Sequence, residues 1–306
     1  MAFRLPDDVS AVGYRLAAFE TVGSTSVEGM SRARAGETGP LWLVTDHQSA
    51  GTGRRGSPWQ TPRGNLAASL LLSTDLPPAV VAQLGFVAGL ALVQALDACS
   101  TSLEGRADAR ASASRVGILG RPVPTPVGVA DPALPSGEGE TARVPRSGFT
   151  LKWPNDVLAD GCKLAGILLQ TEQFGGRRAV VIGIGVNVVH APQGLPYRAT
   201  SLRAVGITEV SANLFGALAK SWLAVHTLWA EGRGFAAVRQ AWLRHAAGLG
   251  APVAVTSGAS VIRGTFETID EQGQLVVRVY DGSLRRISAG EVHFGDAKSA
   301  RHEEMA

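Results

Sequence analysis

The chain is poor in the residue types that mark several common classes of protein. Only two of its 306 residues are cysteines, Cys99 and Cys162, which are too few for a disulfide framework or a cysteine metal cluster and fit a reducing cytoplasm. The six histidines show no metal-ligand spacing. Charged residues make up 18% of the chain, and a net charge of +3 is too small to argue for nucleic-acid binding, although it suits an anionic small molecule.

Long apolar segments are also scarce. The N-terminal residues have no apolar core of the length that a secretory signal needs. Residues 79–96 approach the length of a membrane span, but Gln83, Gln94 and many small residues favour a buried helix. With 45% hydrophobic residues, the chain is expected to be a globular protein of the cytoplasm that does not associate with membranes.

One segment lacks aromatic residues altogether. Residues 103–148 contain no Phe, Trp or Tyr and are rich in Ala, Gly, Pro, Ser and Arg. Such a segment cannot bury enough apolar surface to become ordered, so it is predicted to be a mobile insertion. The expected organisation is a large domain over residues 1–247 that carries this insertion, a small domain over 248–295 and a tail over 296–306.

The remaining sequence alternates between strand and helix patterns. In the large domain, strands are predicted at Tyr14–Phe19, Leu41–Thr45, Leu66–Leu72, Phe149–Trp153, Val157–Leu158, Leu164–Thr171 and Ala179–Val189. The last of these is predicted to be a central strand that is buried on both faces. Helices are predicted from about Ser26 to Ala35, over Pro78–Ala98, and at about 211–231 and 234–247. If Thr25 capped the first helix, Glu28 would complete a capping box.

The small domain changes to period-2 patterns after a predicted hinge at Gly248-Leu249-Gly250. Its strands are predicted at Pro252–Thr256, Ser260–Ile269, Gln274–Val279 and Leu284–Ser288. Five or so short strands within about 45 residues predict a small barrel that resembles an SH3 fold. The fold class is therefore α+β, with a mixed, largely antiparallel sheet backed by helices and a C-terminal SH3-like β-barrel.

Charged residues gather at one predicted hairpin. The stretch Lys152-Trp-Pro-Asn-Asp156 leads into a return strand, and Lys163 follows the next turn. Cations beside a carboxylate at a strand–turn junction can hold a nucleotide phosphate and its metal ion. The alternative is a charged hairpin at the surface.

A second candidate is the loop Gly51-Thr-Gly-Arg-Arg-Gly56-Ser-Pro-Trp59. It begins like a phosphate loop, but Ser57 and Pro58 stand where that motif requires Lys and Ser or Thr. Its two arginines, Arg54 and Arg55, suit bidentate contact with phosphate or carboxylate, and Trp59 could offer an aromatic face to a base. The pattern predicts a flexible lid over an anion, with an exposed basic loop as the alternative.

A third candidate, Gly183-Ile-Gly185, lacks the third glycine of a dinucleotide fingerprint. It predicts a strand that passes close to a ligand or to neighbouring backbone.

Together these motifs resemble those of the biotin protein ligases, in their monofunctional form. The resemblance covers most of residues 14–98 and 149–294. It is carried by Ser24-Thr25, Gln48-Ser-Ala-Gly-Thr-Gly-Arg54-Arg-Gly-x-x-Trp59, Lys152-Trp-Pro-Asn-Asp156, Lys163-Leu-Ala-Gly166, Gly183-Ile-Gly-Val-Asn187 and Gly290-Glu-Val. Blocks of this kind rarely occur in one order by chance.

The resemblance implies an activity and a set of partners. Family members adenylate biotin with ATP, release pyrophosphate, and pass the acyl group to one lysine of the biotin carboxyl carrier domain of acyl-CoA carboxylases. A class II synthetase-like catalytic domain, Mg²⁺ and biotin are implied with it. DNA is not an expected partner, because the segment before Tyr14 is too short for a helix-turn-helix module. A monomer or weak homodimer is expected, and an edge strand near 179–189 is a candidate for pairing two chains.

The resemblance also implies roles for individual residues. Arg54, Lys163 and Asp156 would be catalytic, and Asp156 would bind the metal. Biotin would be bound by Ser24, Thr25, Ser26, Gln48, Thr52, Gly53, Arg54, Lys163 and Gly166. The nucleotide would be bound by Arg54, Arg55, Trp59, Lys152, Asn155, Lys163 and Asn187. Two positions depart from the family pattern: Ser26 usually is Asn or a related residue, and Thr52 stands where arginine is general.

Other functions stay open at this point. A lipoate or octanoate ligase-like acyltransferase has a similar architecture, and the arginine-rich loop and the small barrel favour biotin over it. A non-catalytic biotin-binding regulator would not need Lys163 for turnover. A plain nucleotide-binding module would leave the residues of the biotin site unexplained.

Overall fold

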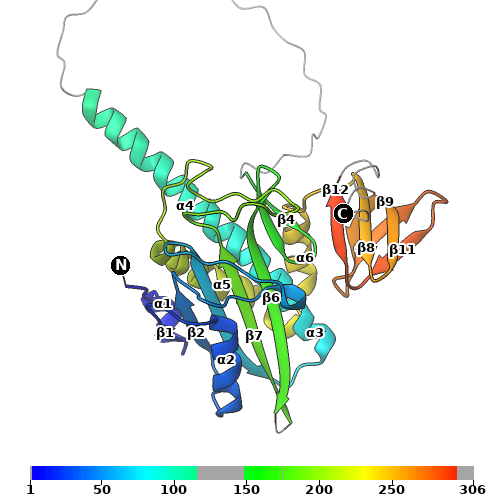
Figure 1. Cartoon of the computed structure of the whole chain (residues 1–306), viewed down its shortest axis with the longest axis horizontal. Helices are drawn as coiled ribbons and strands as arrows, with labels where there is room; N and C mark the ends of the chain where they lie inside the picture. Colours follow the sequence, from blue (N-terminus) through cyan, green and yellow to red (C-terminus); the bar gives the residue numbers. More distant parts are fainter. Residues whose placement is uncertain (1, 116–147, 175, 295–306) are drawn as a thin grey trace, which may run out of the picture.

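A seven-stranded sheet forms the centre of the larger part of the molecule (Figure 1). The computed structural model describes residues 2–115, 148–174 and 176–294, with the backbone alone over 101–115. Only β1 and β2 are parallel, and every other neighbouring pair is antiparallel, so the expected mixed, largely antiparallel sheet is confirmed. Across the sheet the strands are β1 (Arg15–Ala18), β2 (Leu41–Thr45), β3 (Leu66–Thr74), β7 (Arg177–Val186), β6 (Cys162–Phe174), β5 (Asp156–Ala159) and β4 (Phe149–Lys152).

Helices cover the two faces of this sheet differently. Along β7, the side chains of Val180, Ile182 and Ile184 alternate with that of Val181, because successive residues of a strand point to opposite faces. The first three join the main core, which is completed by α4 (Leu84–Arg115), α5 (Ser211–Trp229) and α6 (Phe235–Leu243). Val181 packs instead under α2 (Thr25–Arg34), which covers only part of the opposite face. Two short helices, α1 (Asp7–Ala11) and α3 (Pro78–Ala82), complete this part.

Helix α2 begins one residue earlier than its sequence predicts. Ser24 has extended backbone angles, and its hydroxyl accepts a hydrogen bond from the amide of Val27, so Ser24 is the N-cap. Thr25 is the first helical residue, and the capping box predicted around it is therefore wrong. Glu28 pairs with Arg32 one turn further along the helix, at 2.8 Å.

The helix predicted over Pro78–Ala98 is broken and longer than expected. It divides at Gln83 into α3 and α4, and α4 continues to Arg115, so the prediction of an unstructured insertion is wrong for residues 103–115. The C-terminal part of α4 projects beyond the sheet (Figure 1). The rest of the predicted insertion, residues 116–147, lies outside the described residues. Pro78–Ser100 is apolar enough to cross a membrane, but 67% of its most apolar window is buried, as expected for a core helix.

The edges of the sheet differ from the prediction. Strand β7 lies between β3 and β6, so the suggestion that residues 179–189 form an edge strand is wrong, and β1 and β4 occupy the edges. The outer side of β4 is partly covered by the chain after α6. There the amide of Leu151 donates to the carbonyl of His245 at 2.7 Å, and the amide of Ala247 donates to the carbonyl of Leu151 at 2.9 Å.

The small domain is a five-stranded antiparallel sheet, as the period-2 patterns predict. Five strands agree with the predicted number, although no bounds were predicted for the last of them, and β11 and β12 stand at the two ends of the pairing order. In spatial order the strands are β11 (Leu284–Ile287), β10 (Leu275–Val279), β9 (Ser260–Ile269), β8 (Pro252–Ser257) and β12 (Glu291–Phe294).

The connection between the two sheets is not a free hinge. The amide of Gly250 donates to the carbonyl of Phe266 at 2.8 Å, and the amide of Phe266 donates to the carbonyl of Ala251 at 3.0 Å. Apolar residues of β8, β9 and β10 belong to the same buried cluster as α4 and α6. The small domain is therefore packed firmly against the larger one, despite the glycines at positions 248 and 250.

The ion pair between Arg15 of β1 and Glu37 predicts a pH-dependent contribution to stability. Arg15 donates two hydrogen bonds to Glu37, at 3.0 and 2.5 Å, and the Gly39 amide donates a third, which together lower the pKa of Glu37 to about 2. Since the folded pKa lies below the ordinary value of 4.5, this stability is complete above pH 4.5 and is lost as the pH falls toward 2. For this partly exposed pair, Glu37→Gln should lower the free energy of unfolding at pH 7 by about 1 kcal/mol.

Urea unfolding from pH 7 to pH 2 measures the effect, and the two curves should converge at the acid end. Asp75→Asn, which removes the exposed pair with Arg177 at 3.5 Å, is the control and should change nothing. Equal stability of Glu37→Gln and the unaltered chain at pH 7 would contradict the assignment.

Candidate active site

A cavity of about 450 Å³ opens on the face of the sheet that carries α2. Its walls come from the N-terminus of α2, the loop 51–59, the turn between β4 and β5, the segment 195–197 and the start of β12. A volume of this size accommodates a small-molecule ligand. The cavity is lined by Ser24, Thr25, Ser26, Gln48, Thr52, Gly53, Arg54, Arg55, Trp59, Lys152, Asn155, Asp156, Lys163 and Gly166, together with Ser57, Pro58, Ala67, Trp153, Pro154, Ile167, Leu168, Gly183, Ile184, Gly185, Leu195, Pro196, Tyr197, Gly290, Glu291 and Val292.

Glycines form the floor of this cavity. A Cβ atom at Gly183 would lie 2.5 Å from Ser26 Oγ, and one at Gly185 would lie 2.3 Å from Trp59 Nε1. Gly166, the partner of Gly185 across the β6–β7 pair, also faces the Trp59 ring. Gly183 and Gly185 do permit a close approach, but the groups that approach in this structure are the side chains of Ser26 and Trp59, whereas a ligand or neighbouring backbone was predicted.

One end of the cavity is built from uncharged polar groups. Gln48 Oε1 accepts hydrogen bonds from the amide of Thr25 at 2.8 Å and from its hydroxyl at 3.2 Å, while Gln48 Nε2 donates to Thr61 Oγ1 at 3.1 Å. Ser69 Oγ lies 2.7 Å from Thr25 Oγ1 and 3.0 Å from Ser26 Oγ. These hydroxyl and amide groups fix one another and can orient a neutral polar ligand.

Sequence reasoning missed Ser69 and Thr61. Ser69 is fully buried on β3, opposite Gly183 of β7, and its hydroxyl connects two of the predicted binding residues. The available signal was a single hydroxyl in the otherwise apolar run Leu66–Leu72. A buried polar group needs a partner, but one sequence does not say which partner it finds.

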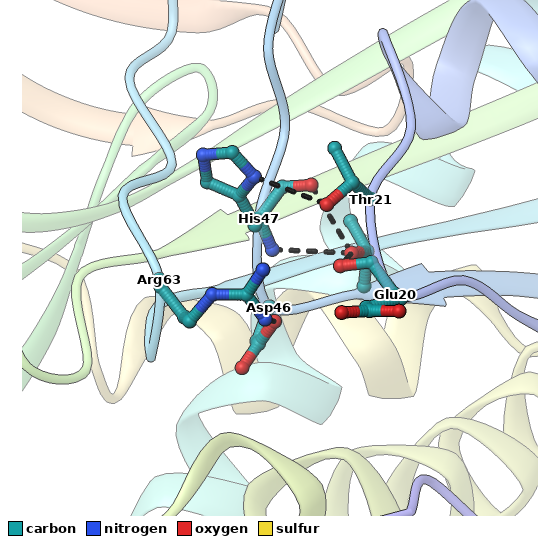
Figure 2. Close-up of polar contacts among 6 residues, drawn as sticks. Glu20, Thr21, Asp46, His47 and Arg63 are labelled. Carbon is teal, nitrogen blue, oxygen red and sulfur yellow. Dashed lines mark hydrogen bonds and ion pairs between the residues drawn. The ribbon is translucent and has the colours of Figure 1, made fainter.

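Contacts outside the cavity hold Gln48 in place. Gln48 forms bridges to Val22 on one side and to Thr61 on the other, so three chain segments lie together. Next to them, Thr21 Oγ1 and His47 Nδ1 lie 3.3 Å apart, and Arg63 Nη1 lies 3.7 Å from Asp46 Oδ1 (Figure 2). These contacts fix the backbone at Gln48 and in the neighbouring segments, so the side-chain amide of Gln48 is held pointing toward the start of α2.

The opposite end of the cavity is charged. Lys163 Nζ lies 2.8 Å from Asp156 Oδ1, and Arg54 Nη1 donates to Asn155 Oδ1 at 3.0 Å. Asn155 Nδ2 in turn donates to the carbonyl of Ile167 at 2.9 Å, which anchors the turn to β6. The predicted hairpin and the predicted arginine loop thus meet, although they are about a hundred residues apart in sequence.

Positive charge is in excess at this end. Four cations, Arg54, Arg55, Lys152 and Lys163, line the cavity with two acids, Asp156 and Glu291. Burial lowers the pKa of Lys152, while Asp156 and Glu291 act in the opposite direction. Burial likewise lowers the pKa of Arg54, and the charge of Arg55 adds to this effect. Partly dehydrated cations with too few counter-charges are suited to bind a polyanion.

Two aromatic rings flank Lys163. Its Nζ lies 5.8 Å from the Trp59 ring centroid and 5.2 Å from that of Tyr197. Trp59 was singled out from the sequence, whereas Tyr197 was not, because it lies in an irregular segment without a motif. Glu291 was also missed as a site residue, although the block Gly290-Glu-Val was noticed.

Asn187 is the one predicted site residue that does not line the cavity. It is buried behind Lys163, where its Nδ2 donates to the carbonyl of Thr200 at 3.1 Å. The amide of Thr200 donates to the carbonyl of Lys163 at 2.9 Å, and the amide of Asn187 donates to the carbonyl of Leu164 at 3.0 Å. Asn187 therefore supports the strand that carries Lys163.

Comparisons with known proteins agree with this geometry. Residues 34–187 match the model of the biotin/lipoate A/B protein ligase family, and residues 248–295 match that of the biotin protein ligase C terminal domain. The biotin--[acetyl-CoA-carboxylase] ligase of Paracoccus denitrificans is 34% identical over 89% of this chain and 97% of its own length. The ligase of the same name from Mycobacterium tuberculosis is 29% identical, over 88% and 85%.

The fold is also similar to that of a solved structure, the biotin protein ligase from Aquifex aeolicus in complex with biotin and ATP. The TM-score is 0.64 at 22% sequence identity, and the match covers 92% of this chain and 99% of the other. The chain therefore belongs to the biotin/lipoate A/B protein ligase family, and its C-terminal match and its relatives place it with the biotin protein ligases.

The close contact between Gly185 and Trp59 predicts that a methyl group added at Gly185 destabilises the protein. In Gly185→Ala the new Cβ would overlap Trp59 Nε1 at 2.3 Å, so the indole must leave its position on the sheet. The free energy of unfolding should fall by about 1–3 kcal/mol, as in other overpacked sites, and the tryptophan emission of the folded protein should change.

Urea unfolding followed by fluorescence measures both effects. Gly216→Ala in α5, where a Cβ would meet nothing within 4 Å, is the control and should be neutral or slightly stabilising. If Gly185→Ala behaved like this control, Trp59 would not lie on the glycine floor in solution.

Proposed function

We propose that this chain is an ATP-dependent ligase that activates biotin as biotinyl-5'-AMP and transfers it to one lysine of a biotin carboxyl carrier domain. The observation that carries the proposal is the division of one cavity into an uncharged hydrogen-bonding end and an end with excess positive charge. A neutral ureido ring fits the first end and phosphates fit the second. The names of the relatives from P. denitrificans and M. tuberculosis support the same substrate.

The uncharged end is the proposed site of the biotin ring. Ser24, Thr25, Ser26 and Gln48 would bind the ureido group through hydroxyl and amide hydrogen bonds. Ser26 shares its hydroxyl with Ser69, so Ser69 limits which hydrogen bonds Ser26 can offer to a ligand. The loop residues Thr52 and Gly53, with Gly166 on the floor, would line the path of the acyl chain toward Lys163.

The charged end is the proposed site of activation. A biotin carboxylate oxygen bonds to the α-phosphorus of ATP while the bond to pyrophosphate breaks, and this step brings two anions together. Arg54, Lys152 and Lys163 are fixed cations that would offset their repulsion, in surroundings that strengthen electrostatic interactions. Trp59 is proposed to stack on the base, and Arg55 to replace part of the contact that Thr52 does not supply.

Asp156 is the residue proposed to hold Mg²⁺. The described residues contain no group of three or more His, Cys, Asp and Glu side chains that could hold a metal. Magnesium is commonly bound by one or two carboxylates together with substrate phosphates, so a single acid beside a phosphate site fits its chemistry. When bound, the ion would supply charge neutralisation at the phosphates.

The second half of the reaction needs a neutral amine. The lysine of the carrier attacks the acyl carbon, AMP leaves, and one proton is released. Asp156 is proposed to orient this amine or to accept its proton, although its carboxylate is already shared with Lys163. The loop 51–59 would act as a lid that keeps water from the reactive anhydride. We place this activity in the cytoplasm, in a monomer or weak homodimer.

Pyrophosphate release from ATP tests the function directly. With biotin present the chain should release pyrophosphate, and a biotin carboxyl carrier domain should then become labelled on one lysine. Release with lipoate or octanoate instead of biotin would identify the related acyltransferase activity. No release with any of the three would leave a biotin-binding regulator as the function.

If the loop 51–59 acts as a lid, Arg54→Gly should lose selectivity for the carrier lysine. Without the hydrogen bond from Arg54 to Asn155, the loop loses its contact with the β4–β5 turn, and biotinyl-adenylate should escape before transfer. Escaped anhydride should label lysines of a bystander protein, which blotting with streptavidin measures.

Arg177→Gly, at an exposed site away from the cavity, is the matched control and should label only the carrier. Equal selectivity of Arg54→Gly and the unaltered chain would exclude the lid role.

A further inference from the structure

A tryptophan in the wall of the cavity is hydrogen-bonded to the small domain. Trp153 lies between Lys152 and the residues Asn155 and Asp156 in the β4–β5 turn, and only 3% of its surface is exposed. Its indole Nε1 donates a hydrogen bond to the carbonyl of Gly273, at 3.2 Å. This contact joins the turn that carries the charged groups of the cavity to the turn between β9 and β10 of the small domain.

The turn that receives this hydrogen bond is itself rigid. Asp270 Oδ1 accepts from the amides of Gln272 at 3.0 Å and Gln274 at 2.8 Å, and the Asp270 carbonyl accepts from the Gly273 amide at 3.1 Å. Gly273 has a φ of +80°, a conformation that favours glycine. A carbonyl held in this way is a fixed acceptor for the indole.

The same turn is seated on the larger domain. A Cβ at Gly273 would lie 2.8 Å from the ring of Phe86, which packs edge-on against Phe235 and Trp242 with centroid separations of 5.5 and 5.3 Å. Arg239 of α6 donates to the carbonyl of Ile269 at 2.7 Å. The Gly273 turn is therefore held between Phe86 and Trp153, and it cannot move without disturbing one of them.

A second contact joins the same two parts of the molecule. Lys152 Nζ lies 5.7 Å from the ring centroid of Phe294 on β12, and Glu291 of the same strand lines the cavity. The small domain thus contacts two successive residues, Lys152 and Trp153, at the start of the segment Lys152–Asp156. By contrast, Gln48 and Ser69 hold the uncharged end of the cavity through bonds to Thr25, Ser26 and Thr61.

We propose that Trp153 is a positioning residue, through which the small domain fixes Lys152, Asn155 and Asp156 for the phosphates of ATP. The inference rests on the proposed function. It predicts different effects on the binding of ATP and of biotin. The hydrogen bond between Trp153 and Gly273 acts on the charged end of the cavity and leaves the hydrogen bonds of the uncharged end unchanged. The hydrogen bond from Trp153 should therefore affect the KM for ATP and leave biotin affinity as it is.

Trp153→Phe tests this inference, because it keeps an aromatic ring and removes the N–H donor. In steady-state pyrophosphate release, the KM for ATP should rise about three- to tenfold, the range expected for one hydrogen bond of ordinary strength. The Kd for biotin, measured by calorimetry without ATP, should not change. Trp222→Phe is the matched control, since it also loses a buried indole hydrogen bond, from Nε1 to Tyr14 Oη at 3.0 Å, but lies on α5 away from the cavity.

Gly273→Ala provides a second route to the same result. Its Cβ would strain the turn and press on Phe86, so the carbonyl should move away from Trp153 and the KM for ATP should rise again. The inference is overturned if both variants keep the KM for ATP of the unaltered chain, if the Kd for biotin weakens equally, or if Trp222→Phe shows the same rise. An unaltered chain that releases no pyrophosphate with biotin would instead refute the proposed function, and this assay is done first.

Discussion

The alternation of side chains along β7 is the constraint on which the rest of the structure depends. One face of this central strand carries branched apolar residues that bind the sheet to α4 and α5, while the other changes from Val181 to Gly183 and Gly185. Because two successive positions on the face that carries α2 lack side chains, the sheet leaves room beside the N-terminus of α2. Ser26 and Trp59 enter that room from segments far away in sequence, and the cavity follows from this absence of side chains.

Charge balance explains why the other end of the cavity is built from three separate parts of the chain. Four cations that are close together and partly buried repel one another and lose hydration, which costs free energy unless anions lie nearby. Asp156 from the hairpin and Glu291 from the small domain supply part of the balance, and a phosphate-bearing substrate would supply the rest. The small domain is thus part of the electrostatics of the cavity.

Periodicity predicted the main elements of the fold well, because the apolar residues that form the buried face of each strand or helix recur at the spacing of that element. Leu41–Thr45 and Ser260–Ile269 are strands with the predicted bounds. The central position of β7 was predicted from its continuous apolar run. What one sequence did not reveal is spatial: that β1 and β4 are the edges of the sheet, that α4 continues to Arg115, and that Ser24 instead of Thr25 caps α2. The motifs located most of the residues that line the cavity, whereas Ser69, Tyr197 and Glu291 depend on tertiary contacts that leave no local pattern.

The two ends of the cavity are built from different sets of residues, although both use the segment 24–69. The start of α2, Gln48 and Ser69 form the uncharged end, while the hairpin 152–163, the arginines of the loop 51–59 and Glu291 of the small domain form the charged end. This division makes the cavity modular in evolution. Substitutions at the start of α2 or at Ser69 could change which acyl compound is accepted and leave Arg54, Lys152 and Lys163 in place. A family that serves more than one acyl cofactor is the expected outcome of such an arrangement.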